Sequence, residues 1–128
     1  MRLISLLIGL GVAALPAAAQ SDERKRLYGT WGTDQQCARE PLAPDLTILA
    51  EPFEIGPQWL KRGQVWCALN WFPVEQRPDG IFTGAFARCG EDGVRDYVVG
   101  MRLTGDSLTL RWDFFSVVNG PLAQCPNS

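Results

Sequence analysis

From Val65 onward, apolar and polar residues alternate with a period of two, which is typical of β-strands. Three turn signatures divide this part of the chain into four segments of strand length. They are Arg77-Pro78-Asp79-Gly80, Glu91-Asp92-Gly93 and Thr104-Gly105-Asp106-Ser107. Pro, Asp and Gly stand in them where tight turns favour these residues. The pattern predicts four consecutive antiparallel strands, a β-meander.

The last predicted hairpin has a register that the sequence itself can test. A two-residue loop at Gly105-Asp106 pairs residues whose numbers have a constant sum. One face then carries large apolar pairs: Leu103 with Leu108, Met101 with Leu110, Val99 with Trp112 and Tyr97 with Phe114. The other face pairs Arg102 with Thr109, Gly100 with Arg111 and Val98 with Asp113. A slip of one residue would mix the faces, so the segregation supports this register.

The same register, carried through the other two turns, assigns the preceding residues to two faces. The apolar face gains Ala85, Ala87, Cys89, Leu69, Trp71 and Pro73. The opposite face carries Phe72, Val74, Phe82, Phe86 and Val98 among Arg88, Asp96, Arg102 and Arg111. Because both faces hold aromatic side chains, we expect the sheet to curl into a barrel or to be half covered by N-terminal strands.

The first half of the chain gives a weaker pattern. Residues 27–31 mix β-forming and aromatic side chains, whereas the prolines at 41 and 44 exclude a central strand there. Short strands are predicted at residues 47–50 and 53–55. The predicted fold class is all-β, an antiparallel meander that closes or partly closes into a small barrel with two disulfides.

The N-terminal segment has the pattern of a secretory signal peptide. Arg2 precedes an apolar run that ends near Leu15, and Ala17-Ala18-Ala19 offers a small-residue cleavage site. An uncleaved anchor needs about 20 apolar residues, and glycines and Pro16 interrupt this shorter run. We expect three parts: residues 1–19 a signal peptide, residues 20–26 a flexible polar leader, and residues 27–128 a single disulfide-stapled β domain.

The cysteines of an exported chain are expected to form disulfides, and this chain has four of them. The predicted register brings Cys67 and Cys89 to one face of adjacent strands, at a diagonal that a disulfide can span. Cys37 is then left for Cys125. Three connectivities are possible, and this is the one that the register favours. Wide spacing and the absence of histidine argue against a zinc site.

Charge and composition limit the classes of partner that the chain is expected to bind. Loss of residues 1–19 removes only Arg2, so the formal net charge changes from −2 to −3. No basic stripe suits a nucleic acid, and we expect no such partner. We also expect no cofactor, no metal and no stable membrane insertion after cleavage.

Candidate catalytic groups are few. The chain has no histidine, the most common proton shuttle. Glu75 and Asp96 lie on predicted strands, but the register brings Asp96 close to Arg88, which would lower its pKa, whereas a general acid needs a raised one. We therefore expect a non-catalytic protein, with a carboxylate-dependent hydrolase as the less favoured alternative.

Two surfaces are candidates for ligand or partner contact. The first is a stretch bracketed by glycines that contains Trp59, Lys61 and Arg62. We expect an exposed loop aromatic there, unless Trp59 folds over the end of the barrel. The second has the aromatic and Arg composition of interface hot spots, unless N-terminal strands cover it. Its residues are Phe72, Phe86, Arg88 and Arg111.

Leu27-Tyr28-Gly29-Thr30-Trp31, followed by antiparallel strands, resembles the G-x-W opening of lipocalin-like small barrels. Those barrels bind small apolar ligands in the barrel mouth, which the resemblance implies here, although this chain is much shorter than a full lipocalin. A second likeness, to periplasmic lysozyme inhibitors, lies in architecture and compartment, since their Ser-Gly-x-x-Tyr loop is absent. We expect a periplasmic or secreted binding module for a small apolar ligand or an envelope protein. The alternative is an inhibitor of a cell-wall hydrolase.

Overall fold

The computed structural model describes residues 13–14, 16–39, 50–90, 95–113 and 117–126. The strands are β1 (Ala13–Ala14), β2 (Gly29–Gly32), β3 (Phe53–Ile55), β4 (Trp59–Arg62), β5 (Val65–Trp71), β6 (Glu75–Arg77), β7 (Gly80–Cys89), β8 (Arg95–Thr104), β9 (Ser107–Trp112) and β10 (Val118–Gln124). Between them lie the helices α1 (Ala17–Arg24) and α2 (Asp34–Ala38) and the 3₁₀ turn η1 (Lys25–Leu27).

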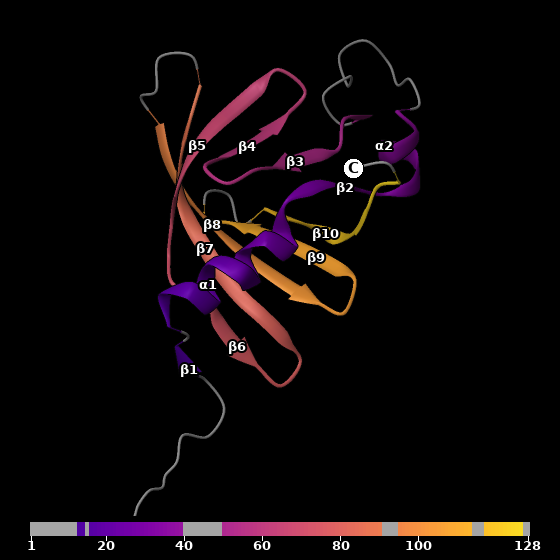
Figure 1. The fold of residues 1–128 in the computed structure, drawn as a ribbon. Helices are drawn as coiled ribbons and strands as arrows, with labels where there is room; N and C mark the ends of the chain where they lie inside the picture. Colours follow the sequence, from indigo (N-terminus) through magenta and orange to yellow (C-terminus); the bar gives the residue numbers. More distant parts are fainter. Residues whose placement is uncertain (1–12, 15, 40–49, 91–94, 114–116, 127–128) are drawn as a thin grey trace, which may run out of the picture.

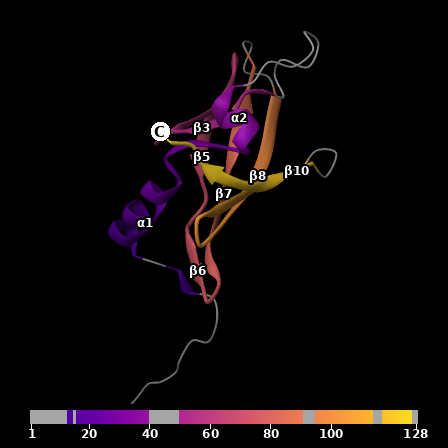
Figure 2. The ribbon, with the colours of Figure 1, turned by 90° about the vertical axis from the view of Figure 1, so that its right-hand side faces the viewer.

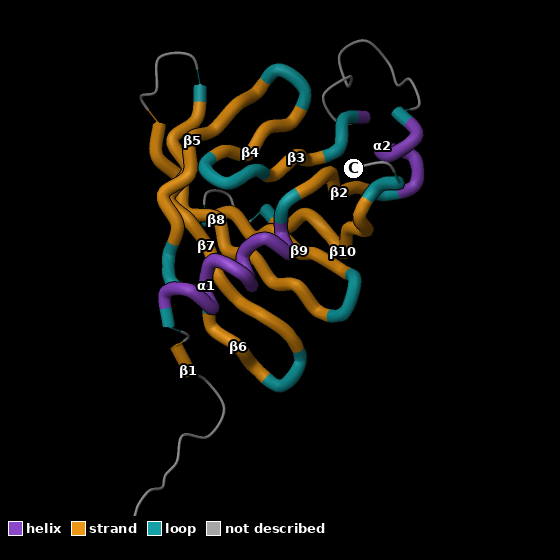
Figure 3. The backbone as a smooth tube through the Cα atoms, viewed as in Figure 1, coloured by secondary structure: helices purple, strands orange, loops and turns teal. Residues whose placement is uncertain are grey.

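Eight of these strands close into an antiparallel barrel (Figure 1 and Figure 3). Hydrogen-bonded neighbours follow the order β7-β5-β4-β3-β2-β10-β9-β8, and β8 pairs again with β7. The predicted all-β barrel is confirmed. Its N-terminal strands do not cover the meander as a second layer but complete the circle through the pairing of β2 with β10.

The predicted register of the β8–β9 hairpin is confirmed. Leu103 faces Leu108, Met101 faces Leu110 and Val99 faces Trp112. All six side chains are buried, because they point into the barrel. Tyr97 packs against the core, while its predicted partner Phe114 and the predicted turn at residues 91–93 lie outside the described residues.

Trp31 and the residues before it close one end of the barrel core. Leu27, at the end of η1, is fully buried, and the indole N–H of Trp31 donates a 2.9 Å hydrogen bond to the Leu27 carbonyl. The G-x-W motif therefore begins β2 with its tryptophan in the core. The strand predicted at residues 53–55 is confirmed as β3, whereas residues 47–49 of the other predicted strand lie outside the described part and Ala50 is in a 3₁₀ turn.

The strand predicted to continue through Phe72 and Val74 is interrupted. β5 ends at Trp71 and β6 starts at Glu75, because Pro73 has no N–H for the ladder. The interruption changes the alternation of faces, so that Val74 is fully buried and Pro73 is exposed. Their predicted faces were both wrong. Beyond this break, β6 pairs with β7 and the two form a hairpin that projects from the barrel (Figure 1).

Residues 20–26, expected as a flexible leader, are helical in the structure. They belong to α1, which lies outside the barrel (Figure 2), and to η1, which ends at the buried Leu27. Arg24 attaches this segment to the sheet: its guanidinium lies 5.2 Å from the Trp71 ring and donates a 3.4 Å hydrogen bond to the Phe72 carbonyl. The polar sequence alone does not reveal these contacts. No helix among the described residues is long and apolar enough to cross a membrane.

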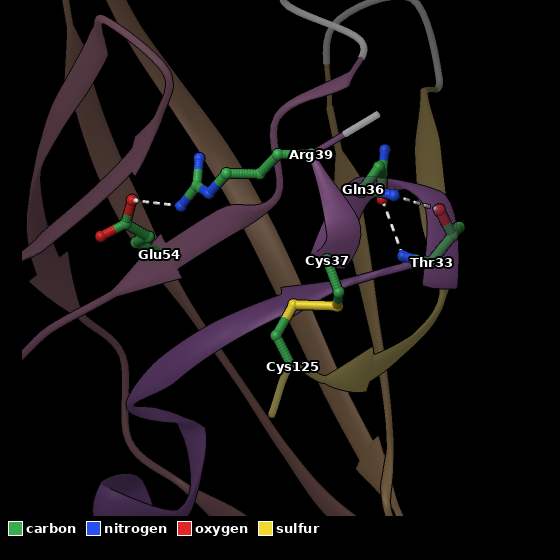
Figure 4. The surroundings of a disulfide bond; sticks show 6 residues. All are labelled: Thr33, Gln36, Cys37, Arg39, Glu54 and Cys125. Atoms are coloured by element: carbon green, nitrogen blue, oxygen red, sulfur yellow. Dashed lines mark hydrogen bonds and ion pairs between the residues drawn. A yellow bond between two sulfur atoms is a disulfide. The ribbon is translucent and has the colours of Figure 1, made fainter. Parts of the chain in front are cut away.

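Both predicted disulfides are confirmed. Cys67 and Cys89 are directly opposite each other on β5 and β7, not diagonal as the sequence predicted, with Cα atoms 4.0 Å apart. Cys37 of α2 binds Cys125, which follows β10 (Figure 4). The second bond fastens the C-terminal residues beside α2. These disulfides indicate an oxidising compartment.

Candidate functional site

One face of the barrel carries most of the predicted contact residues on its outside. It spans four neighbouring strands, β4, β5, β7 and β8. Inward residues such as Leu60, Leu69 and Ala87 are buried, so the residues between them point outward. We call the following set the outer aromatic face: Trp59, Lys61, Trp66, Ala68, Asn70, Phe72, Phe86, Arg88, Asp96 and Val98.

The strand register joins the two surfaces that the sequence predicted separately. Trp59 is opposite Ala68, Ala68 is opposite Arg88, and Arg88 is opposite Asp96. These four residues form one row across four strands, in which each step measures about 4.8 Å. Trp59 is therefore a half-buried strand residue and not the exposed loop aromatic that the sequence predicted, since β4 begins with it.

Two large apolar side chains on this face are open to solvent. Phe86 is 51% exposed and Trp66 is 50% exposed. Phe86 also touches the ring of Phe72 edge to face, with centroids 4.8 Å apart. Trp66 was not predicted as a contact residue, although the buried Cys67 and Leu69 beside it fix its outward direction by alternation. That signal was present in the sequence.

Arg88 and Asp96 form an ion pair at the β7–β8 side of the face. The guanidinium donates hydrogen bonds of 2.9 and 3.2 Å to the two carboxylate oxygens. The hydrogen bonds from Arg88, together with its charge, lower the pKa of Asp96, although partial desolvation opposes this, and the same bonds raise the pKa of Arg88. Their side chains are 63% and 56% exposed, so the pair stays accessible to a partner.

Small residues leave two hollows in the outer surface. The first has a volume of about 490 Å³ and opens beside Phe86, where its lining includes Ala68, Asn70, Arg88 and Asp96. The second, of about 310 Å³, lies over β8 and β9. Its lining residues are Val98, Gly100, Arg111, Trp112 and Asp113. Arg111 thus borders the face from β9, opposite Gly100 as predicted.

The side chains of Lys61 and Arg62 lie on opposite sides of the sheet, because the two residues are neighbours on one strand. Lys61 is outward, with its ammonium 5.8 Å from the Trp59 ring centroid. Arg62 pairs with the buried Phe53, and its guanidinium lies 4.6 Å from that ring. Its Nε donates to the Glu51 carbonyl, and burial lowers the pKa of Arg62 while the charge of Glu51 opposes that shift. The structure therefore assigns Arg62 to the barrel and not to the outer face.

Both candidate acids lie beside cations, Asp96 beside Arg88 as described above. Glu75, the other candidate acid, is 2.9 Å from the guanidinium of Arg77. No group of three His, Cys, Asp or Glu residues in the described ranges could hold a metal ion. The arrangement on the outer face suits non-covalent contact, since it offers aromatic rings, paired charges and the Asn70 amide side by side.

A third hollow lies at the end of the barrel, between η1, the β8–β9 turn and the end of β10. It measures about 590 Å³, and its lining includes Lys25, Tyr28 and Trp31. Leu27, next to these lining residues in the chain, belongs to the buried core.

Comparisons of the chain with protein families, with curated proteins and with solved structures find no match.

Proposed function

We propose that this chain is a non-catalytic binding module of the periplasm that contacts an envelope protein through its outer aromatic face. The observation that carries the proposal is the half exposure of Trp66 and Phe86 on one side of the barrel. Large apolar side chains grouped on a surface mark interaction sites, whereas scattered ones need no explanation. The adjacent Arg88–Asp96 pair adds the polar groups that such interfaces contain.

Two features support the compartment. The first is the N-terminal pattern of a signal peptide, with Arg2, an apolar run and small residues at 17–19. The second is the pair of disulfides, which persist in oxidising surroundings such as the periplasm. A module of this kind would act outside the cytoplasm.

The interior of the barrel favours a surface mode of binding. Core side chains from all eight barrel strands pack against one another, and Leu27 adds to them from η1. A small apolar ligand, which the lipocalin-like resemblance implies, would therefore bind in the hollow of about 590 Å³ at the barrel end. That volume lies within the usual range of ligand sites, so this hollow is the second candidate.

Site-specific photo-crosslinking in the periplasm tests the proposal. A photoreactive phenylalanine analogue is placed at position 66, and for the control at position 35, an exposed site on α2 that lines none of the three hollows. We expect a discrete adduct with another envelope protein at position 66 and none at position 35. Adducts of equal yield at both positions, or none at either, would contradict the proposal.

The captured protein then decides between the kinds of partner. Its affinity for the purified chain should fall at least tenfold in Trp66→Ala. The reason is that truncating an aromatic side chain that a partner buries at the centre of an interface costs about 2 kcal/mol or more. If the captured protein is a cell-wall hydrolase and the chain lowers its activity, the module is the inhibitor that we gave as the alternative. An unchanged affinity in Trp66→Ala would exclude the outer aromatic face.

A further inference from the structure

We propose that the β7–β8 part of the outer aromatic face binds a second copy of this chain. The two copies meet face to face about a two-fold axis. The axis runs parallel to β7 and β8, in front of the outer face and midway between the two strands. The inference rests on the proposed function, because it names the partner of one part of that contact face. In the dimer the second copy covers Phe86 and the Arg88–Asp96 pair, and the envelope protein contacts the part of the face that stays open, at Trp59 and Trp66 on β4 and β5.

Charge complementarity is the first argument. Arg88 on β7 is directly opposite Asp96 on β8, and both are exposed. A two-fold axis between these strands places β7 of one copy over β8 of the other. Arg88 then meets Asp96 of the second copy, and the same contact occurs a second time by symmetry. The two-fold contact thus brings opposite charges together at this pair, although the whole chain is acidic, with a net charge of −2.

Shape is the second argument. Phe86 is paired with Val98 and Gly84 with Gly100 along the same two strands. The ring of Phe72 covers Gly84, since a Cβ added there would lie 3.2 Å from it. The rotation therefore sets Phe86 over Val98 of the second copy and Phe72 over its Gly100. Val98 and Gly100 line the hollow of about 310 Å³, so a projecting aromatic pair faces a matching recess.

Gly100 is the third argument, because one copy alone gives no reason for a glycine there. It does not have the left-handed backbone that favours glycine. A Cβ added at this position would meet nothing closer than the Arg111 carbonyl, 3.8 Å away. Glycine within a strand weakens it and often marks a bulge, a tight bend or a place where a ligand or another backbone approaches closely. The second copy supplies that approach, and Arg111, at the border of the hollow, would lie beside the entering Phe72 ring.

A charge-exchange experiment tests the inference on the purified, disulfide-bonded chain. Sedimentation equilibrium should show a concentration-dependent dimer for the unchanged chain. Arg88→Asp alone and Asp96→Arg alone should be monomers, because each variant opposes like charges across the axis. An equimolar mixture of the two variants should form a one-to-one heterodimer, in which both contacts are again complementary. An unchanged chain that stays monomeric up to millimolar concentration, or a mixture that stays monomeric, would overturn the inference.

A second pair of variants tests shape without altering charge. Gly100→Leu fills the recess and should abolish the dimer, while far-UV circular dichroism and the melting temperature stay those of a folded barrel. Ala123→Leu, on the exposed side of β10, is the matched control and should still dimerise. A dimer that persists in Gly100→Leu would overturn the inference. Since these measurements need no other protein, they fail or succeed separately from crosslinking at position 66.

Discussion

Arg88 and Asp96 face each other across β7 and β8, and the guanidinium donates two hydrogen bonds to the carboxylate. Both groups are on the solvent side of the barrel. The pair is therefore accessible to a partner, to salt and to protons, and its titration can be followed in the folded protein.

The Asp96 carboxyl should titrate below the ordinary aspartate pKa of 3.8, because Arg88 donates hydrogen bonds to its charged form. A lowered folded pKa stabilises the fold above the unfolded pKa, and this contribution is lost as the pH falls through the folded value. Carbon-13 NMR of the carboxyl group measures the titration. Arg88→Gln should return the pKa of Asp96 toward 3.8, and an unchanged titration would show that the ion pair does not form in solution.

Trp31 should matter to stability and Trp66 should not. Trp31 is 3% exposed and its indole N–H binds the Leu27 carbonyl, so Trp31→Phe leaves a buried carbonyl without its donor. We expect the free energy of unfolding to fall by about 1 to 3 kcal/mol in urea titrations. Trp66→Phe, at a half-exposed site, should stay within about 0.5 kcal/mol of the unchanged chain. Equal losses in both variants would contradict the assigned burial.

Gly80 and Gly100 lie on the paired strands β7 and β8 and should respond differently to alanine. Gly80 has a φ of +151°, and a Cβ there would lie 2.1 Å from the Leu103 carbonyl oxygen. Gly80→Ala should therefore lower the free energy of unfolding by about 1 to 3 kcal/mol. A Cβ at Gly100 would make only an ordinary van der Waals contact, 3.8 Å from the Arg111 carbonyl oxygen, so Gly100→Ala should change this free energy by less than about 0.5 kcal/mol. Thermal melts of the two variants decide the matter, and a destabilised Gly100→Ala would refute the open surface there.

The two disulfides should contribute unequally. Chain-entropy arguments assign about 4.6 kcal/mol to a loop that closes across 88 positions, as Cys37–Cys125 does. They assign about 3.4 kcal/mol to the Cys67–Cys89 loop, with its separation of 22. Paired Cys→Ser variants, compared by denaturant unfolding, should follow this order. The reverse order would show that contacts within the native barrel outweigh chain entropy.

Local rules were sufficient to predict β7, β8 and β9 with their inward faces, but not β10, since no strand was predicted at residues 118–124. The Gly105-Asp106 turn fixes the register of β8 and β9, and the alternation confirms it from both faces. The same register, continued through the two earlier turns, placed Cys67 on the strand beside that of Cys89. The pairing of Cys37 with Cys125 then followed by elimination.

Other features depend on contacts between distant residues, which periodicity does not contain. The prediction from sequence placed Val74 outward because it continued the alternation past Pro73 without a break. A proline within a strand is itself a signal of such a break. Barrel closure required β2 to find β10, and nothing local specifies that pair. For the candidate site, Phe86, Arg88 and Asp96 were placed correctly by alternation, whereas Trp59 was taken for a loop residue.

Closure through β2 and β10 determines when this barrel can finish folding. Trp31 pairs with Gln124 and Gly32 with Ala123, so the first and last barrel strands of the chain lie side by side. A nascent chain cannot complete its sheet until its final residues have been synthesised, and such non-local pairing is intrinsically slow. Until then β2 and β9 remain unpaired edges, which are templates for aggregation. A chain truncated before β10 would thus accumulate as an open, self-associating sheet and not as a slightly less stable barrel.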